Sequence, residues 1–181
     1  TRLIRADGDP VVLHEPPETA ELLGLAPPRL LQLPAADGTR LDAALYEPPS
    51  VGDIPAPLVV SVYGGPHAQR VMDEWSLTVD LRAQYLAQNG FAVLRVDNRG
   101  AANRGLAFEA HIANRMGTVE VEDQAAAVRE LAAKGLIDAA RVGIFGWSYG
   151  GYMSAMCMMR EPDLFKVGVA GAPVVDWDGY D

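Results

Sequence analysis

The hydrophobic and polar positions divide the chain into two parts of different character, with the change near residue 56. In the first part, short apolar runs alternate with prolines and turn residues, a pattern typical of short antiparallel strands and linkers. Residues 39–46 alternate so that Leu41, Ala43 and Leu45 share one face of a half-buried strand. The predicted elements are a hairpin of residues 3–4 and 11–13, a linker over 14–28 with a short helix at 18–23, and an antiparallel pair of 30–33 and 39–46.

From residue 56 onward, continuous apolar runs alternate with segments of helical periodicity. Val121, Ala125 and Val128 recur every three or four positions, and Gly135 is a natural helix C-cap. Apolar strands that alternate with helices predict an α/β fold, with a mostly parallel sheet covered on both faces and a ligand at the carboxyl ends of its strands. The predicted strands are residues 58–63, 91–96, 142–145 and 167–170, and the predicted helices are 77–88, 119–134 and 151–159.

Composition excludes several function classes. The formal net charge of −9 argues against a nucleic-acid-binding protein, which would carry a basic face. The single cysteine, Cys157, cannot form an intrachain disulfide or a thiolate metal cluster, and we expect neither a cofactor nor a metal. No apolar run is long enough to predict a membrane segment, and no signal peptide is apparent. Because the chain begins at Thr1, we expect it to be a piece of a longer protein whose compartment stays open.

The clearest chemical signal is GWSYGG, residues 146–151. A predicted strand, then Gly-x-Ser-x-Gly, then a predicted helix is the arrangement of a nucleophile elbow. Its turn is so tight that a side chain at either glycine would collide with the neighbouring strand or helix. The turn raises the hydroxyl of Ser148 above the sheet and places the backbone N–H of Tyr149 at a helix N-terminus, where it can stabilise an oxyanion.

The extended motif GWSYGGY resembles the nucleophile segment of the dipeptidyl peptidase IV family, in the prolyl oligopeptidase group of serine peptidases. Other segments resemble that family in the same order. They are Tyr63-Gly64-Gly65-Pro66, Val96-Asp97-Asn98-Arg99-Gly100, residues 117–124 (GTVEVEDQ), residues 172–177 (APVVDW) and Tyr180-Asp181. The resemblance implies an incomplete α/β-hydrolase fold that lacks its last strands. It also implies that residues 1–34 are the end of a propeller and a linker, and that residues 35–181 are the N-terminal part of the peptidase domain.

The resemblance implies roles for particular residues. Ser148 is expected to be the nucleophile, with the Tyr149 N–H and the Tyr63 hydroxyl as oxyanion donors. A phenol suits that role because it is a neutral donor at pH 7. The pocket for the residue before the cut bond is expected to consist of Tyr149, Val174, Trp177 and Tyr180, an aromatic and aliphatic box that favours a proline ring. We expect Asp97–Gly100 to be a structural loop.

A general base for Ser148 is not apparent in the sequence. In α/β-hydrolases the acid and the histidine follow the serine, but His14, His67 and His111 all precede it. We expect His67 to be a loop histidine in contact with solvent. Asp176 follows the elbow helix, but hydrogen bonding within a loop is the expected role of its carboxylate. The resemblance therefore implies that the triad Asp and His lie beyond residue 181 and that this chain alone is inactive.

The parent enzyme is expected to release N-terminal X-Pro or X-Ala dipeptides from a peptide substrate through an acyl-enzyme on Ser148. An acylaminoacyl-peptidase or esterase of the same fold is an alternative, and a non-catalytic module is another. A fragment that lacks the last strands would leave residues 167–170 as an apolar sheet edge. Such an edge pairs readily with other chains, which predicts a homo-oligomer.

Overall fold

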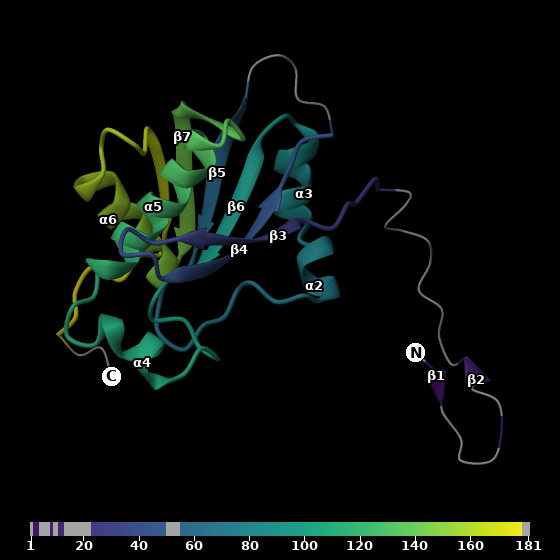
Figure 1. Ribbon diagram of the computed structural model, residues 1–181, viewed down its shortest axis with the longest axis horizontal. Helices are drawn as coiled ribbons and strands as arrows, with labels where there is room; N and C mark the ends of the chain where they lie inside the picture. The colour runs from purple at the N-terminus through teal and green to yellow at the C-terminus, as the bar shows by residue number, and fades with distance from the viewer. Residues whose placement is uncertain (1, 4–7, 9–10, 13–22, 50–54, 179–181) are drawn as a thin grey trace.

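The computed structural model describes residues 2–3, 8, 11–12, 23–49 and 55–178 (Figure 1). The predicted N-terminal hairpin is present: β1 (Arg2–Leu3) pairs antiparallel with β2 (Val11–Val12). The short helix predicted at residues 18–23 lies, apart from its last position, outside the described residues.

A six-stranded sheet with the strand order β3-β4-β6-β5-β7-β8 forms the centre of the molecule. The pairs β3–β4 and β4–β6 are antiparallel, and the three remaining pairs are parallel, so the mostly parallel sheet is confirmed. The first strand, β3, falls within residues 1–34, so the sheet begins before the predicted start of the peptidase domain. The strands are β3 (Arg29–Pro34), β4 (Arg40–Tyr46), β5 (Ala56–Val62), β6 (Ala92–Asp97), β7 (Ile137–Trp147) and β8 (Val167–Gly171).

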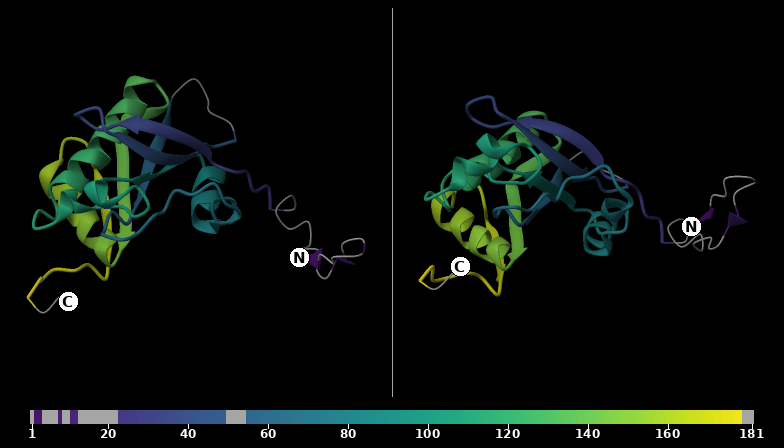
Figure 2. Two further views of the ribbon diagram at one scale, coloured as in Figure 1. Left: turned by 60° about the horizontal axis from the view of Figure 1, so that its bottom comes forward. Right: turned by 90° about the horizontal axis from the view of Figure 1, so that it is seen from below.

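Helices lie on both faces of this sheet, as predicted, but they cover the two faces unequally (Figures 1 and 2). One face packs against α5 (Val119–Ala133) and α6 (Tyr149–Arg160), and the main core lies between the sheet and these two helices. The other face contacts α3 (Leu81–Gln88) through β4 and β6. Three short helices complete the described fold: α2 (Trp75–Thr78), α4 (Leu106–Glu109) and the 3₁₀ helix Ala110–Ile112. Among the described helices, none is long and apolar enough to cross a bilayer.

The α3 face of the sheet carries an apolar groove of about 890 Å³ over β5, β7 and β8, beside α3. Its walls include Val59, Leu86 and Phe145 together with Val167 and Val169 of the last strand. Val167 and Val169 are 64% and 61% exposed. In the described part of the chain, the sheet is therefore bare where the apolar sequence of these strands predicts cover.

The helix predicted over residues 77–88 is two helices, so that prediction was wrong. The chain breaks at Val79, and Asp80 starts α3 as its N-cap, with its carboxylate accepting from the N–H groups of Arg82 and Ala83 at 3.2 Å each. An aspartate that satisfies two unpaired helix N–H groups favours a new start over a continuous helix. The apolar periodicity is similar in both arrangements, so it could not separate them.

Candidate active site

The turn at Ser148 has the strained backbone of a nucleophile elbow. Ser148 joins the end of β7 to the start of α6 with φ 59° and ψ −121°, a combination that costs a non-glycine residue about 1–3 kcal/mol. Its N–H donates to the Gly171 carbonyl at 2.9 Å, and its carbonyl accepts from Gly151 and Tyr152 at 2.9 and 3.1 Å. These three bonds hold the strained residue in place, and Ser148 itself is exposed to solvent.

The two glycines of the motif are required by close backbone approach, as the sequence predicted. A Cβ at Gly146 would lie 2.3 Å from the Gly150 carbonyl oxygen, and a Cβ at Gly150 would lie 2.3 Å from the Val62 carbonyl oxygen. Both contacts are with backbone, which cannot rotate away. Glycine at these positions therefore lets the start of α6 sit directly against the ends of β5 and β7.

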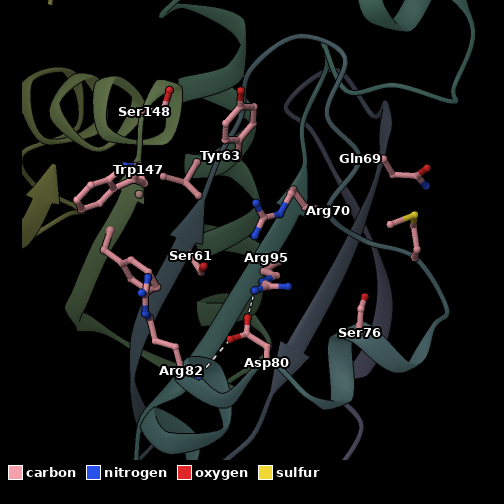
Figure 3. A pocket seen from close by; sticks show the side chains of 14 residues that line it. Ser61, Tyr63, Gln69, Arg70, Ser76, Asp80, Arg82, Arg95, Trp147 and Ser148 are labelled. Carbon is pink, nitrogen blue, oxygen red and sulfur yellow. Dashed lines mark hydrogen bonds and ion pairs between the residues drawn. The ribbon is translucent and has the colours of Figure 1, made fainter. Parts of the chain in front are cut away.

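Tyr63 and Ser148 come from neighbouring strand ends. Tyr63 directly follows β5, and both residues line one cavity, with their hydroxyl groups on the same side of it (Figure 3). The Tyr63 ring is half-buried, and its centroid lies 6.1 Å from that of Tyr149. Parallel pairing of β5 with β7 brings these segments together although 85 positions separate them (148 − 63).

The ring of Tyr149 is the centre of an aromatic cluster. The residue is 1% exposed, and its ring centroid lies 5.4 Å from that of Tyr152 and 5.8 Å from that of Trp177. Tyr152 and Trp177 also meet edge to face at 5.0 Å. Two of the predicted pocket residues, Tyr149 and Trp177, are thus in contact. Val174 is half-buried in the same C-terminal segment, and Tyr180 lies outside the described residues.

A buried carboxylate, for which the sequence predicted no role, holds the Tyr149 ring. The Tyr149 hydroxyl donates to Glu120 at 2.7 Å, and Glu120 also accepts from the N–H groups of Gly117 and Thr118 at 2.6 and 3.1 Å. Glu120 is 0% exposed at the start of α5. Burial and the nearby Glu120 carboxylate raise the pKa of Tyr152. The sequence showed residues 117–124 as a motif, but the motif alone does not indicate that the Glu120 carboxylate contacts Tyr149.

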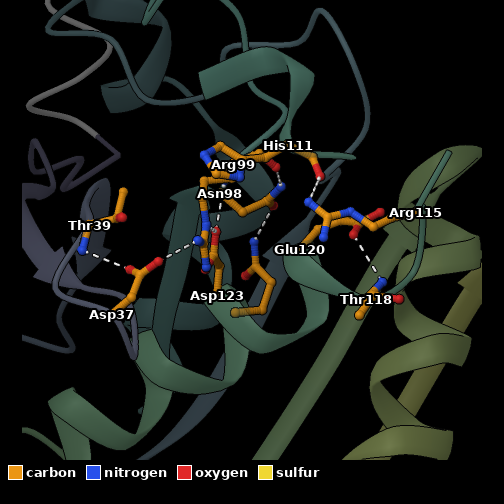
Figure 4. Close-up of polar contacts among 10 residues, drawn as sticks. Asp37, Thr39, Asn98, Arg99, His111, Arg115, Thr118, Glu120 and Asp123 are labelled. Carbon is orange, nitrogen blue, oxygen red and sulfur yellow. Dashed lines mark hydrogen bonds and ion pairs between the residues drawn. The ribbon is translucent and has the colours of Figure 1, made fainter. Parts of the chain in front are cut away.

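A second polar network connects α5 to the loop after β6 (Figure 4). Asp123 is 0% exposed and accepts charge-assisted bonds from the Arg99 guanidinium at 2.6, 3.0 and 3.2 Å. It also accepts from the Arg99 backbone N–H at 2.9 Å. Gln124 donates to Asn98 at 2.8 Å, and Asn98 donates to the Gly64 carbonyl at 3.0 Å. The loop of residues 97–100 is therefore structural, as expected, and it supports the segment that follows Tyr63.

The same network reaches the β3–β4 turn. Arg99 donates to Asp37 at 2.7 Å. The Thr39 N–H and, to a smaller extent, the Arg99 guanidinium lower the pKa of Asp37 to about 2. Asp37 is thus ionised at neutral pH and ties the antiparallel edge of the sheet to the loop beside the candidate site.

A cavity of about 700 Å³ opens beside Ser148 on the α3 face of the sheet (Figure 3). We call it the arginine cavity, because Arg70, Arg82 and Arg95 line it together with a single carboxylate, Asp80. Asp80 is ion-paired with Arg95. The sequence does not indicate this set, because these arginines lie on a loop, a helix and a strand with no shared motif.

The described histidines do not contact the serine hydroxyl. His67 is exposed and lies 3.4 Å from the Glu109 carboxylate, which confirms a loop histidine in contact with solvent. His111 lies in the 3₁₀ helix, and in the described residues its hydrogen bond is made by its carbonyl, which accepts from Arg115. His14 lies outside the described residues. Asp176 accepts from the Asp178 N–H at 3.0 Å, the local loop bond that was expected.

Cys157, the single cysteine of the chain, is inert by its environment. Its side chain is fully buried in α6, and burial raises the pKa of its thiol to about 12. The thiolate, which is the reactive form, is therefore negligibly populated at neutral pH. Within the described residues, no three His, Cys, Asp or Glu side chains form a group that could hold a metal ion.

Comparison with known proteins agrees with this geometry. Residues 77–181 match the model of the prolyl oligopeptidase family. Human dipeptidyl peptidase 8 is 40% identical over 157 residues, 86% of this chain and 18% of the relative, and mouse prolyl endopeptidase FAP is 42% identical over 125 residues, 68% of this chain and 16% of the relative. The chain therefore spans less than a fifth of these relatives.

A crystal structure from Bacteroides ovatus, described provisionally as a dipeptidyl aminopeptidase IV, superposes with a TM-score of 0.80 at 41% identity. The match covers 84% of this chain and 22% of that chain. The shared fold is a partial α/β-hydrolase fold, in which a mostly parallel sheet supports a serine on the turn between a strand and a helix. The family match extends over more than half of the residues, and the sheet and elbow have the arrangement that the motifs predicted. This chain belongs to the prolyl oligopeptidase family.

Proposed function

We propose that the chain is part of a serine peptidase of the dipeptidyl peptidase IV type, with Ser148 as its nucleophile. The observation that carries the proposal is the strained φ of Ser148 between β7 and α6, with the Tyr63 hydroxyl on the same side of the shared cavity. Relatives named as dipeptidyl and prolyl peptidases support the same reaction class.

In the proposed reaction, Ser148 Oγ attacks the carbonyl carbon of the scissile bond and its proton passes to a general base. The Tyr63 hydroxyl and the Tyr149 N–H stabilise the oxyanion, and the amine leaves with the proton. Water then hydrolyses the acyl-enzyme ester. The partly exposed rings of Tyr152 and Trp177, which pack against the buried Tyr149 ring, offer aromatic faces that suit a proline ring, and this supports release of X-Pro or X-Ala dipeptides.

The proposal requires a histidine and an orienting carboxylate, which the described residues do not supply to Ser148. We propose that both come from the longer protein, since relatives of this chain are about four to five times its length. The division into a linking segment, residues 1–34, and a catalytic part, residues 35–181, stays a prediction.

The isolated chain should hydrolyse an X-Pro p-nitroanilide at least ~10³-fold more slowly than the longer protein, because a serine without its base is a weak nucleophile. The measurement is p-nitroaniline release by equal molar amounts of the two proteins. Equal turnover would contradict the proposal that the base is supplied from elsewhere. If the longer protein hydrolyses acyl esters but not X-Pro amides, an esterase is favoured.

We also propose that the isolated chain self-associates through β8 and the apolar groove. Val167 and Val169 are exposed on the last strand, whose outer edge has no partner strand among the described residues. Val169→Lys should therefore shift the isolated chain toward monomer in light scattering, whereas Val175→Lys, at an exposed loop position outside the groove, should not. A monomer at all concentrations would refute the proposal.

A further inference from the structure

We propose that the arginine cavity binds the part of the peptide that follows the cut bond, and that Arg70 and Arg82 select a carboxylate there. This inference rests on the proposed function, because it takes Ser148 as the nucleophile. The carboxylate can belong to an Asp or Glu side chain or to the C-terminus of a short peptide. Either source presents the same planar anion to a guanidinium.

The position of the cavity relative to Ser148 is the first observation. The cavity lies on the α3 face of the sheet, where Ser61 of β5 and Arg95 of β6 line it. The Tyr149 ring packs into the main core with α5 and α6, on the opposite face. Ser148 lies between the two regions, at the strand ends. When a serine attacks a peptide carbonyl, the acyl part and the leaving amine extend in different directions from the reacting carbon. With the residue before the cut bond against the partly exposed Tyr152 and Trp177 rings, the arginine cavity lies on the other side of Ser148, where we infer that the leaving part extends.

The charge of the cavity is the second observation. The chain carries a net charge of −9, yet this cavity is lined by three arginines and one carboxylate. With the buried Asp97 carboxylate beside the Arg70 loop also counted, the local charge is still positive, +1 (3 − 2). Asp80 is already ion-paired with Arg95 and also caps α3. In the described residues, no ion pair involves Arg70 or Arg82. A cavity with this balance attracts anions, whereas most of the acidic surface repels them.

The arginines are held in place from the protein side, which is the third observation. The backbone N–H groups of Arg70 and Val71 donate to the Asp97 carboxylate at 2.8 and 3.0 Å, and this fixes the loop that carries Arg70. The Arg82 guanidinium lies over the Phe145 ring, 5.3 Å from its centroid. Arg95 is largely buried, and its Nε atom has no hydrogen-bond partner in the described structure. Figure 3 shows Arg70, Arg82 and Arg95 below Tyr63 and Ser148 in that view.

The test compares leaving groups that differ only in charge. The longer protein is given the peptides X-Pro-Asp-amide and X-Pro-Asn-amide, and dipeptide release is measured by chromatography. We expect kcat/KM to be about tenfold higher for the aspartate peptide, the size of one added charge-assisted hydrogen bond. X-Pro-Gly with a free carboxyl terminus against X-Pro-Gly-amide tests the second source of the carboxylate.

The double variant Arg70→Gln/Arg82→Gln should bring the aspartate-to-asparagine ratio close to one. Arg129→Gln is the matched control, because it also removes an arginine charge but lies on α5, on the opposite face, and it should leave both the ratio and the turnover unchanged. Equal rates for the two peptides with the unmodified enzyme would overturn the inference and leave the proposed function intact. So would a ratio that survives the double substitution. Failure to hydrolyse any X-Pro peptide would overturn both.

Discussion

Ser148→Ala in the longer protein should abolish labelling by a fluorophosphonate and lower kcat for an X-Pro p-nitroanilide by about 10⁶-fold, the loss typical of a removed serine nucleophile. Alanine has the same Cβ as serine, so it adopts the strained φ of 59° at a similar cost and the fold should persist. The measurements are labelling read on a gel and p-nitroaniline release.

Tyr63→Phe separates nucleophilic attack from oxyanion stabilisation in the same assays. Removing one oxyanion donor should lower kcat by about 10²–10³-fold with little change in KM, and labelling should be slowed and not abolished. Tyr85→Phe removes a phenol from an exposed position of α3 and is the matched control, for which no change is expected. Undiminished labelling of Ser148→Ala would show that another residue is the nucleophile.

Asp123→Ala should lower the free energy of unfolding by about 3–5 kcal/mol, because it leaves the largely buried Arg99 guanidinium without its main partner. That is a large part of the total stability of a domain of this size. Urea denaturation followed by tryptophan fluorescence measures the loss. Asp123→Asn keeps the shape but removes the charge, and it should fall between the wild type and Asp123→Ala.

Arg129→Ala is the control for that experiment. It removes an ion pair of similar length with Glu161, but the Arg129 side chain is 57% exposed, so the cost should stay below about 1 kcal/mol. Equal losses for Asp123→Ala and Arg129→Ala would show that the burial of the Arg99–Asp123 pair does not matter. The Asp123 substitution should also slow catalysis, since Arg99 and Asn98 support the segment that follows Tyr63.

The elbow could be predicted from sequence because its causes are local. The glycines at 146 and 150 are needed by contacts within one turn and with the adjacent strand, so five residues between a strand and a helix carry the whole signal. Continuous apolar runs also identified the parallel strands, since strands that are buried on both faces are apolar without interruption. The break between α2 and α3 was missed because the Asp80 cap favours a new helix start over a continuous helix, and apolar periodicity is similar in both arrangements.

The amino-acid sequence by itself determined the succession of strands and helices along the chain, the tight turn at Ser148 and the family motifs. Each of these depends on neighbours a few residues apart. The tertiary structure alone decided that Glu120 anchors Tyr149, that Asp123 pairs with Arg99 and that three arginines meet beside the serine. Each of these contacts joins side chains from different elements, and their meeting is fixed by the order in which β6, β5 and β7 lie in the sheet. Strand order follows from the packing of the whole domain, and no short stretch of sequence encodes it.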